Sequence, residues 1–370
     1  MTTIINNENK KLNVPNLRFP EFQGEWITCK IKEVLSLGNG RDYKHLSNGN
    51  IPVFGTGGYM TSVDECLYDG ETTFIGRKGS INKPFYYNGK FWTVDTLFYT
   101  HSFNSITPKF TYCLFQTINW LKYNEASGVP SLSKDTIEKI KIKIPGLKEQ
   151  NKIAKLMFSL DERIATQNKI IDKLQSLIKG IVDCTILRKE KNAIVGDVCS
   201  ISEQIRAEAN IDDIITVRLH GNGVCKSSAE NLQLGATQYY RRRAGQLIYG
   251  KQNFHNGAIG IVPISLNNGI TSKDIPSFDI DEMKCNSVYL LAQLQSPQYY
   301  KPAEALTTGT GSKRLKEETF LKMPIVLPNK REQDNIAVLI HRASMNLDHA
   351  KRLLELLSIQ KQFLLRQMFI

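Results

Sequence analysis

Several polar segments of this chain combine arginine, aromatic and amide side chains. The densest is Tyr239-Tyr-Arg-Arg-Arg243, where two aromatic rings precede three guanidinium groups. An arginine can hold a phosphate or read the N7 and O6 atoms of guanine, whereas a lysine mainly contacts phosphate. Each cluster is either a solvated loop or part of a surface that binds a nucleic acid. The candidate contacts are Arg41, Tyr43, Lys44, Arg77, Lys78, Lys83, Arg218, His220, Arg241, Arg242, Arg243, Lys251, Asn253, Lys313 and Arg314.

Motifs for catalysis are missing from the sequence. It contains no GxxxxGK[ST] phosphate loop and no HExxH zinc motif. The six histidines show no ligand spacing, and no two of the seven cysteines are spaced as CxxC. We therefore predict no catalytic residue, no metal site and no cofactor on this chain. The scattered, odd-numbered cysteines are typical of a reducing cytoplasm.

The composition predicts a folded protein with a basic surface. Of the 370 residues, 41% are apolar and 23% are charged, and the net charge is 48 − 36 = +12. Segments 1–145, 146–190, 191–328 and 329–370 carry +4, +3, +2 and +3. Because no basic tail holds the excess, a polyanion would have to bind a folded surface. No apolar run is long enough to span a membrane, and we expect a cytoplasmic protein with no secretory signal.

The chain contains an internal repeat. With a shift of 183 residues, 10 of the 25 positions from 132 to 156 are identical, among them Gln150 and Gln333. Chance would give roughly one or two identities at ordinary residue frequencies. Each copy contains a short strand, at 140–144 and 323–327, that a proline ends. A long helix follows each strand, with an acidic residue in its first turn.

Both helices carry apolar residues at alternating steps of three and four, which is a heptad pattern. The two patterns keep the same phase under the 183-residue shift, and Lys361 is the one poor fit. Each seam could pack on its own domain, the two could pack on each other, or a partner protein could dock along them. The seam residues include Leu160, Ile164, Ile171, Leu174, Ile178, Leu347, Leu354, Leu357 and Leu364.

The segments upstream of each repeat differ from one another. Both alternate short runs of Val, Ile, Phe and Tyr with Gly and Asn, a pattern that favours β-rich domains with many turns. Weak echoes remain: Ile31–Val34 is similar to Val195–Val198, and Phe74–Lys78 to Ile248–Gln252. A frame written twice that carries two different domains suits a ligand with two unlike halves.

At this point the motifs resemble those of a known family. The opening Val14-Pro-Asn-Leu-Arg-Phe-Pro-Glu-Phe with Trp26, the segments Phe74–Lys83 and Phe91–Tyr99, and Gly128–Leu132 resemble specificity (S) subunits of type I restriction–modification systems. The resemblance covers essentially the whole chain, and the first half is the more typical.

The resemblance implies an α/β (α+β) fold with a pseudo-twofold duplication. Two mixed α/β target recognition domains, 1–145 and 191–328, would be separated by an antiparallel coiled coil of two conserved helices, 146–190 and 329–370. Each domain would read one half of a split, asymmetric DNA site. The helices would dock methyltransferase (M) subunits, expected to number two, and motor–nuclease (R) subunits would join for restriction. S-adenosylmethionine, ATP and Mg would then belong to those partners, and the chain itself would be non-catalytic.

Two rival interpretations stay open at the level of sequence. A coiled-coil adaptor with two protein-binding β domains would share the repeat and the seams. A self-sufficient nuclease would share the basic surface. The bases recognised depend on loop geometry that the sequence does not contain.

Overall fold

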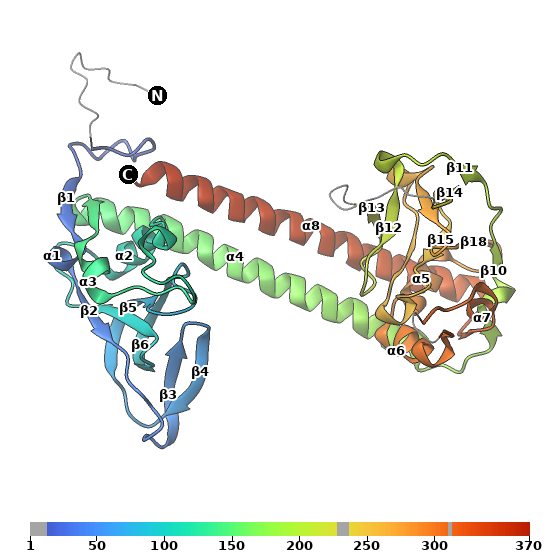
Figure 1. Cartoon of the computed structure of the whole chain (residues 1–370), viewed down its shortest axis with the longest axis horizontal. Helices are drawn as coiled ribbons and strands as arrows, with labels where there is room; N and C mark the ends of the chain where they lie inside the picture. The colour runs from blue at the N-terminus through green and yellow to red at the C-terminus, as the bar shows by residue number, and fades with distance from the viewer. Residues whose placement is uncertain (1–12, 228–236, 310–312) are drawn as a thin grey trace, which may run out of the picture. The chain divides into compact units, whose positions relative to one another are not determined.

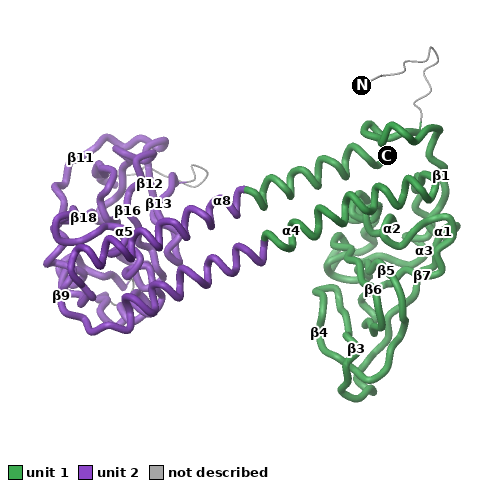
Figure 2. Tube along the Cα trace, turned by 180° about the vertical axis from the view of Figure 1, so that it is seen from behind, with its two compact units in different colours: residues 1–167, 353–370 green, residues 168–352 purple. Residues whose placement is uncertain are grey.

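The structure, a computed structural model, describes residues 13–227, 237–309 and 313–370. The chain forms two compact units: unit 1 comprises 1–167 with 353–370, and unit 2 comprises 168–352 (Figure 2). Helices α4 (Leu147–Val182) and α8 (Lys330–Met368), labelled in Figure 1, each contribute to both units, as the change of colour along each helix in Figure 2 shows. The expected mixed α/β fold with two long helices is confirmed. In the part of the chain that is described, no helix is long and apolar enough to cross a membrane.

Unit 1 is built on a six-stranded sheet in the order β2-β7-β5-β6-β3-β4. Neighbouring strands are antiparallel except for β3 and β6, which are parallel. The strands of unit 1 are β1 (Ile27–Lys30), β2 (Ser36–Asn39), β3 (Asn48–Gly55), β4 (Gly58–Val63), β5 (Tyr68–Gly76), β6 (Phe85–Thr93), β7 (Leu97–His101) and β8 (Lys141–Ile144). Its short helices are α1 (Ile31–Val34), α2 (Pro108–Phe115) and α3 (Lys134–Lys139).

The C-terminal end of the chain completes the core of unit 1. Met368 and Phe369 at the end of α8 are buried in the same apolar cluster as Trp26 and Phe110. The Phe369 ring stacks on Phe110 with their centroids 5.4 Å apart. The backbone N–H of Leu17 donates to the carbonyl of Gln367 at 2.9 Å. The first and last described segments of the chain therefore belong to one folded unit.

The opening sequence motif is held by the first turn of α4. The Arg18 guanidinium donates to both carboxylate oxygens of Glu149, each at 2.8 Å. The Trp26 indole donates to the same carboxylate at 3.4 Å. Glu149 is only 3% exposed, so its charge needs this partner.

Unit 2 divides its strands among smaller sheets. A four-stranded sheet has the order β10-β18-β15-β16, and a three-stranded sheet has the order β11-β14-β17. The strands are β9 (Ala193–Ile194), β10 (Cys199–Ile201), β11 (Arg206–Ala207), β12 (Ile215–Val217), β13 (Val224–Lys226), β14 (Tyr239–Arg241), β15 (Leu247–Tyr249), β16 (Ile259–Ile261), β17 (Ile270–Ser272), β18 (Ser277–Ile280) and β19 (Pro324–Ile325). The short helices are α5 (Ser287–Leu294), α6 (Pro297–Tyr300) and α7 (Glu317–Leu321).

The internal repeat is visible in the backbone of both units. Strand β1 pairs antiparallel with β8 in unit 1, and β9 pairs antiparallel with β19 in unit 2. In each unit a short helical turn follows, and its first N–H donates to a carbonyl of the repeat: Ile31 to Ile140 at 3.1 Å and Val195 to Met323 at 2.9 Å. The two acceptors are 183 residues apart, so the weak echo between 31–34 and 195–198 marks equivalent turns.

The heptad seams are the least exposed faces of the long helices. In unit 1, Leu160 and Leu357 are each 4% exposed, and Ile164, Leu354 and Leu364 are half-buried. In unit 2, Ile171 is 9% exposed, and Leu174, Ile178 and Leu347 are half-buried. Within each unit α4 and α8 lie side by side in both views (Figures 1 and 2). This arrangement agrees with the coiled coil that the family resemblance implies, and contacts between individual seam residues stay a prediction.

Two details of the helices differ from the sequence prediction. Regular α-helix in α4 ends at Val182, and a π-helical turn covers Asp183–Leu187. Lys361, the poor fit in the seam, forms an ion pair with Asp161 across the two helices of unit 1. The lysine side chain is only 13% exposed. A polar pair within a seam restricts the register in which two helices can pack.

Candidate nucleic-acid interface

The candidate contacts Arg77 and Lys78 of unit 1 lie on the loop that leaves β5. Their backbone N–H groups both donate to the carbonyl of Thr96, at 2.7 and 3.3 Å. The carbonyl of Arg77 accepts from the N–H of Leu132 at 2.9 Å. Two separate sequence motifs, 74–83 and 128–132, therefore fix one loop. Both basic side chains are exposed.

Arg41 belongs to the same loop cluster. Its N–H donates to the carbonyl of Thr93 at 2.8 Å, and its carbonyl accepts from the Trp92 indole at 3.0 Å. The preceding Gly40 leaves no room for a side chain, because a Cβ there would lie 1.9 Å from the carbonyl oxygen of Val94. Arg41, Arg77 and Lys78 thus surround the turn between β6 and β7. We call these loops, 40–45, 76–83 and 94–96, the unit 1 loop cluster.

The other candidate contacts of unit 1 divide into exposed and half-buried side chains. Lys44 and Lys83 are exposed, and neither forms an ion pair in the described parts of the chain. Tyr43 packs instead on the apolar cluster of Val53, Val63 and Trp92. Its ring therefore anchors the 40–45 loop.

Unit 2 holds its corresponding loop in the same way. The N–H of Lys251 donates to the carbonyl of Asp274 at 2.9 Å, as Arg77 does to Thr96. The carbonyl of Lys251 accepts from the N–H of Leu315 at 2.9 Å, and Leu315 is the repeat partner of Leu132. Lys251 of unit 2 is therefore the structural equivalent of Arg77. We call loops 250–253, 273–276 and 313–317 the unit 2 loop cluster.

Most basic candidates of unit 2 already have a carboxylate partner. Lys251 pairs with Glu317 at 2.7 Å, and Arg314 pairs with Asp274 at 3.2 Å. Lys313 pairs with Glu304 at 3.2 Å. Arg243 lies 3.5 Å from Asp279. These separations in the sequence, from 9 to 66 residues, explain why sequence reasoning missed the acidic partners.

Arg242 is a correction to the predicted contacts. It is fully buried, and its guanidinium donates to Thr271 Oγ1 at 2.8 Å, Ser277 Oγ at 2.9 Å and the carbonyl of Ile275 at 3.0 Å. A fourth contact reaches Gln204 Oε1 at 3.3 Å. Burial lowers the pKa of this guanidinium to about 10, so it is still charged at neutral pH. The prediction of a DNA contact is wrong for Arg242, which ties strands together inside unit 2.

The three remaining clusters of unit 2 are exposed. Arg241, at the end of β14, and Asn253 point to solvent. Arg218 and His220 lie on a loop joined to the 253–257 turn, because the N–H of His220 donates to the carbonyl of Asn256 at 2.7 Å. Arg218 Nε also donates to Cys225 Sγ at 3.1 Å. These residues stay candidate contacts.

Metal binding and thiol chemistry are the alternatives to a binding surface. No group of three or more His, Cys, Asp or Glu side chains within the described residues could hold a metal ion. All seven cysteines are free thiols. Burial raises the pKa of Cys113, Cys199 and Cys285 to about 12, so these thiols are neutral and poor nucleophiles.

Comparison with known proteins identifies a domain in the first part of the chain. Residues 23–176 match the model described as a type I restriction modification DNA specificity domain. The chain is similar to type I specificity subunits, and the matched segment is a DNA specificity domain of that family. The segments that carry the predicted resemblance to this family in the first half, from Phe74 to Leu132, lie inside the match.

Relatives extend this likeness over most of the chain. The type I restriction enzyme MjaVIII specificity subunit of Methanocaldococcus jannaschii is 22% identical over 305 residues, which is 73% of this chain and 69% of the relative. A putative type I restriction enzyme specificity subunit of Haemophilus influenzae is 26% identical over 117 residues, 30% of each chain. The crystal structure of the S subunit from M. genitalium shares the fold, with a TM-score of 0.71 at 12% identity over 96% of this chain and 99% of that one.

Two candidate residues of the specificity domain escaped the sequence prediction. Tyr59 and Met60 lie just after the turn between β3 and β4 and are 64% and 50% exposed. An exposed apolar side chain of this kind can contact the methyl group of thymine or a base face. The turn itself, Gly55-Thr-Gly-Gly58, was visible in the sequence, but nothing in it showed that the following residues would be exposed.

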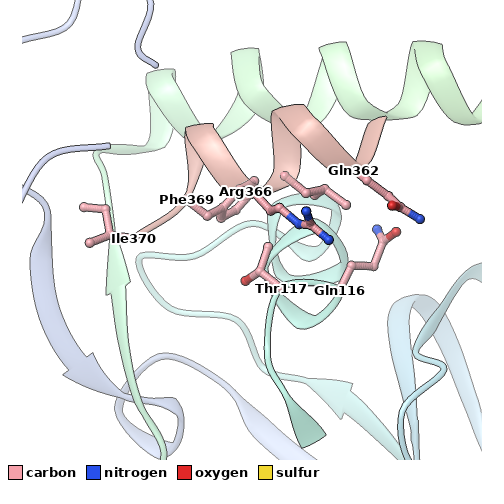
Figure 3. Close-up of a pocket in the computed structure, with 7 residues that line it drawn as sticks. Gln116, Thr117, Gln362, Arg366, Phe369 and Ile370 are labelled. Atoms are coloured by element: carbon pink, nitrogen blue, oxygen red, sulfur yellow. The ribbon is translucent and has the colours of Figure 1, made fainter. Parts of the chain in front are cut away.

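A pocket of about 530 Å³ lies beside the end of α8 in unit 1. Figure 3 shows the polar ends of Gln116, Gln362 and Arg366 gathered in it. The remaining lining residues are Thr117, Leu365, Phe369 and Ile370. Its lining contains neither a carboxylate side chain nor a histidine, so it offers a surface for binding and no acid–base pair.

Proposed function

We propose that this chain is the DNA-sequence-specificity subunit of a type I restriction–modification complex, and that its two units each read one half of a bipartite, asymmetric DNA target. The observation that carries the proposal is a loop frame built twice with different side chains. Arg77 and Lys251 occupy equivalent backbone positions, held by equivalent hydrogen bonds, but their surroundings differ in sequence and charge. Two unlike readers on one repeated frame suit two unlike half-sites.

Base and phosphate contacts would come from the exposed donors of the loop clusters. Arginines can read guanine, lysines would contact phosphate, and amides such as Asn253 can read adenine. Tyr59 and Met60 would add apolar contacts. Affinity would then fall steeply with salt, because each phosphate contact releases condensed counterions.

Methyltransferase (M) subunits, in the proposal two, would dock along the long helices. Support comes from large apolar side chains that stay exposed on α8, including Leu356 at 63% and Phe363 at 57%. Exposed apolar patches of this kind are typical of protein–protein contacts. Motor–nuclease (R) subunits would join the same cytoplasmic complex. S-adenosylmethionine, ATP and Mg would be bound by these partners, and this chain would need no cofactor.

An exchange of readers tests the two-unit proposal. Residues 191–328 are replaced by the corresponding segment of another specificity subunit, and methylated adenines are mapped in the DNA of a strain that also carries the methyltransferase. One half of the methylated sequence should change while the other half stays the same. Unchanged methylation of the whole target would contradict the proposal.

A gel shift with random-sequence DNA separates this function from the adaptor with two protein-binding domains. A specificity subunit, assembled with a methyltransferase subunit, shifts the duplex at low salt. An adaptor leaves the DNA unbound with or without that partner. Cleavage of the duplex by the purified chain with magnesium would support the nuclease instead.

A further inference from the structure

The two loop clusters can be compared residue by residue because their backbones are held by the same bonds. The backbone N–H of Leu132 donates to the carbonyl of Arg77, and the N–H of Leu315 donates to the carbonyl of Lys251, each at 2.9 Å. Glu125 donates to the carbonyl of Ser131 as Thr308 donates to that of Arg314, each at 3.0 Å. These bonds make Arg77 of unit 1 the structural equivalent of Lys251 in unit 2, and Ser131 the equivalent of Arg314. The acceptors Thr96 and Asp274 are likewise equivalent.

The charges at these equivalent positions differ between the two units. Unit 1 has the neutral residues Thr96 and Ser131 where unit 2 has the ion pair of Asp274 and Arg314. The second contrast involves the start of the following helix. Lys134 of unit 1 corresponds to Glu317 of unit 2 under the 183-residue shift. Arg77 therefore has a lysine at the position where Lys251 has its carboxylate partner.

Burial and geometry show how far the cations of unit 2 are neutralised. Lys251 is 11% exposed and its Nζ lies 2.7 Å from Glu317. Arg314 and Asp274 are 46% and 49% exposed, with 3.2 Å between their charged atoms. Arg77 is exposed and, among the residues that the structure describes, has no carboxylate partner; its guanidinium lies 3.5 Å from the carbonyl of Asp95.

The more exposed of the two ion pairs, Arg314 with Asp274, contributes little to the stability of the fold. An exposed ion pair contributes only about 0–1 kcal/mol to folding. The pair has a larger effect on the attraction of the loop for a DNA phosphate, because the carboxylate both neutralises the cation and repels the phosphate. A cation that is already paired also adds little to counterion release on binding.

We propose that Asp274 and Glu317 are specificity-determining residues. Their carboxylates neutralise the cations of the unit 2 loop cluster and so weaken its attraction for phosphate. Unit 2 then discriminates between bases while adding little non-specific attraction, and unit 1, through Arg77 and its unpaired neighbours, supplies most of that attraction. The inference rests on the proposed function, since it presumes that both loop clusters face DNA.

The test measures binding of the full-length chain, with its methyltransferase subunit, to a random-sequence 40-bp duplex at a series of KCl concentrations. Asp274→Asn with Glu317→Gln should raise affinity about tenfold at low salt and steepen the salt slope by roughly one to two. Asp274→Asn alone, at a side chain that is 49% exposed, should move both quantities in the same direction without a change in folding. The control Glu203→Gln removes one charge from an exposed residue of unit 2 and should change affinity less than about twofold.

The reciprocal change introduces into unit 1 a carboxylate like that of Glu317 in unit 2. Lys134→Glu puts a carboxylate at the position equivalent to Glu317 and also removes the ion pair of Lys134 with Glu138. It should lower affinity for the random duplex by about tenfold or more, whereas Lys122→Glu, an equal change of charge at another exposed position, should have a smaller effect. If the wild-type complex binds and the unit 2 variants leave affinity and slope unchanged, the inference is wrong. If the wild-type complex binds no DNA at any salt concentration, the proposed function itself fails.

Discussion

The side-chain oxygen of Gln150 accepts a hydrogen bond from the backbone N–H of Thr107 at 2.8 Å. Its amide nitrogen donates to the carbonyls of Ser105 and Pro145 at 2.9 and 2.8 Å. Gln333 makes the same three bonds in unit 2, to Asn286 at 2.9 Å and to the carbonyls of Lys284 and Pro328 at 3.1 and 2.8 Å. One glutamine per unit therefore joins the start of a long helix to a short helix of the same unit.

Removing either glutamine should loosen only its own unit. Gln150 is fully buried, so Gln150→Ala leaves one donor and two acceptors unpaired, at a cost of about 1–3 kcal/mol. Hydrogen exchange should speed up in α2, which begins after Thr107, and stay unchanged in α5. Gln333→Ala should show the reverse, so that each variant is the control for the other. Equal acceleration of both helices in either variant would contradict this assignment.

The ion pair between Lys361 and Asp161 should specify packing more than it stabilises it. Asp161 Oδ2 is buried without a hydrogen-bond partner in the described structure, so removing the lysine leaves a costly charge. We expect Lys361→Met to lower the free energy of unfolding by about 1–3 kcal/mol. The double variant Lys361→Met with Asp161→Leu should recover most of that loss, measured by urea unfolding. A double variant as unstable as the single one would show that the pair itself provides the stability.

The duplicated frame was predictable from the sequence because its signals are local. The strand of 140–144, the prolines that follow it and the heptad steps depend on neighbouring residues, and β8 and α4 lie where these signals place them. Lys361 shows the limit of such reasoning. Its misfit is resolved by Asp161, 200 residues away, and only the fold brings the two together.

The candidate site was predictable in its types of residue but not in their states. The exposed Arg41 and Arg77 of unit 1 match the prediction of available donors. In unit 2, composition alone could not separate a paired lysine such as Lys251 from a free one. Arg242 follows the end of β14 and is buried between the exposed Arg241 and Arg243, and the run of three arginines does not indicate which one is buried.

Arg242 should behave as a structural residue between two surface residues. Its buried guanidinium is bonded only to neutral groups, among them Thr271 and Ser277. Arg242→Met removes a charge but leaves those groups unpaired in a gap, and we expect a loss of more than about 2 kcal/mol in thermal or urea unfolding. Arg241→Ala and Arg243→Ala change exposed positions and should stay within about 0.5 kcal/mol of wild type. Equal losses in all three variants would contradict the distinction.

Arg241 and Arg242 should also differ in whether a loss of DNA binding is accompanied by a loss of stability. Arg241→Ala should weaken binding of the complex to duplex DNA while the fold stays intact, since its side chain is exposed. Arg242→Lys keeps the charge but cannot reproduce the planar set of donors, and should lower stability and DNA affinity together. A loss of affinity for Arg242→Lys with no loss of stability would indicate direct contact with DNA, against the burial seen here.

The exposed apolar face of α8 should be needed for assembly and not for folding. Leu353, Leu356, Ile359 and Phe363 are 42–63% exposed, at spacings that keep them near one face of the helix. Phe363→Glu with Leu356→Glu should leave the melting temperature within a few degrees of wild type and weaken co-purification with the methyltransferase subunit at least tenfold. Glu355→Gln, at an exposed position next to Leu356, is the control and should assemble normally. Normal assembly of the double glutamate variant would place the docking surface elsewhere on the chain.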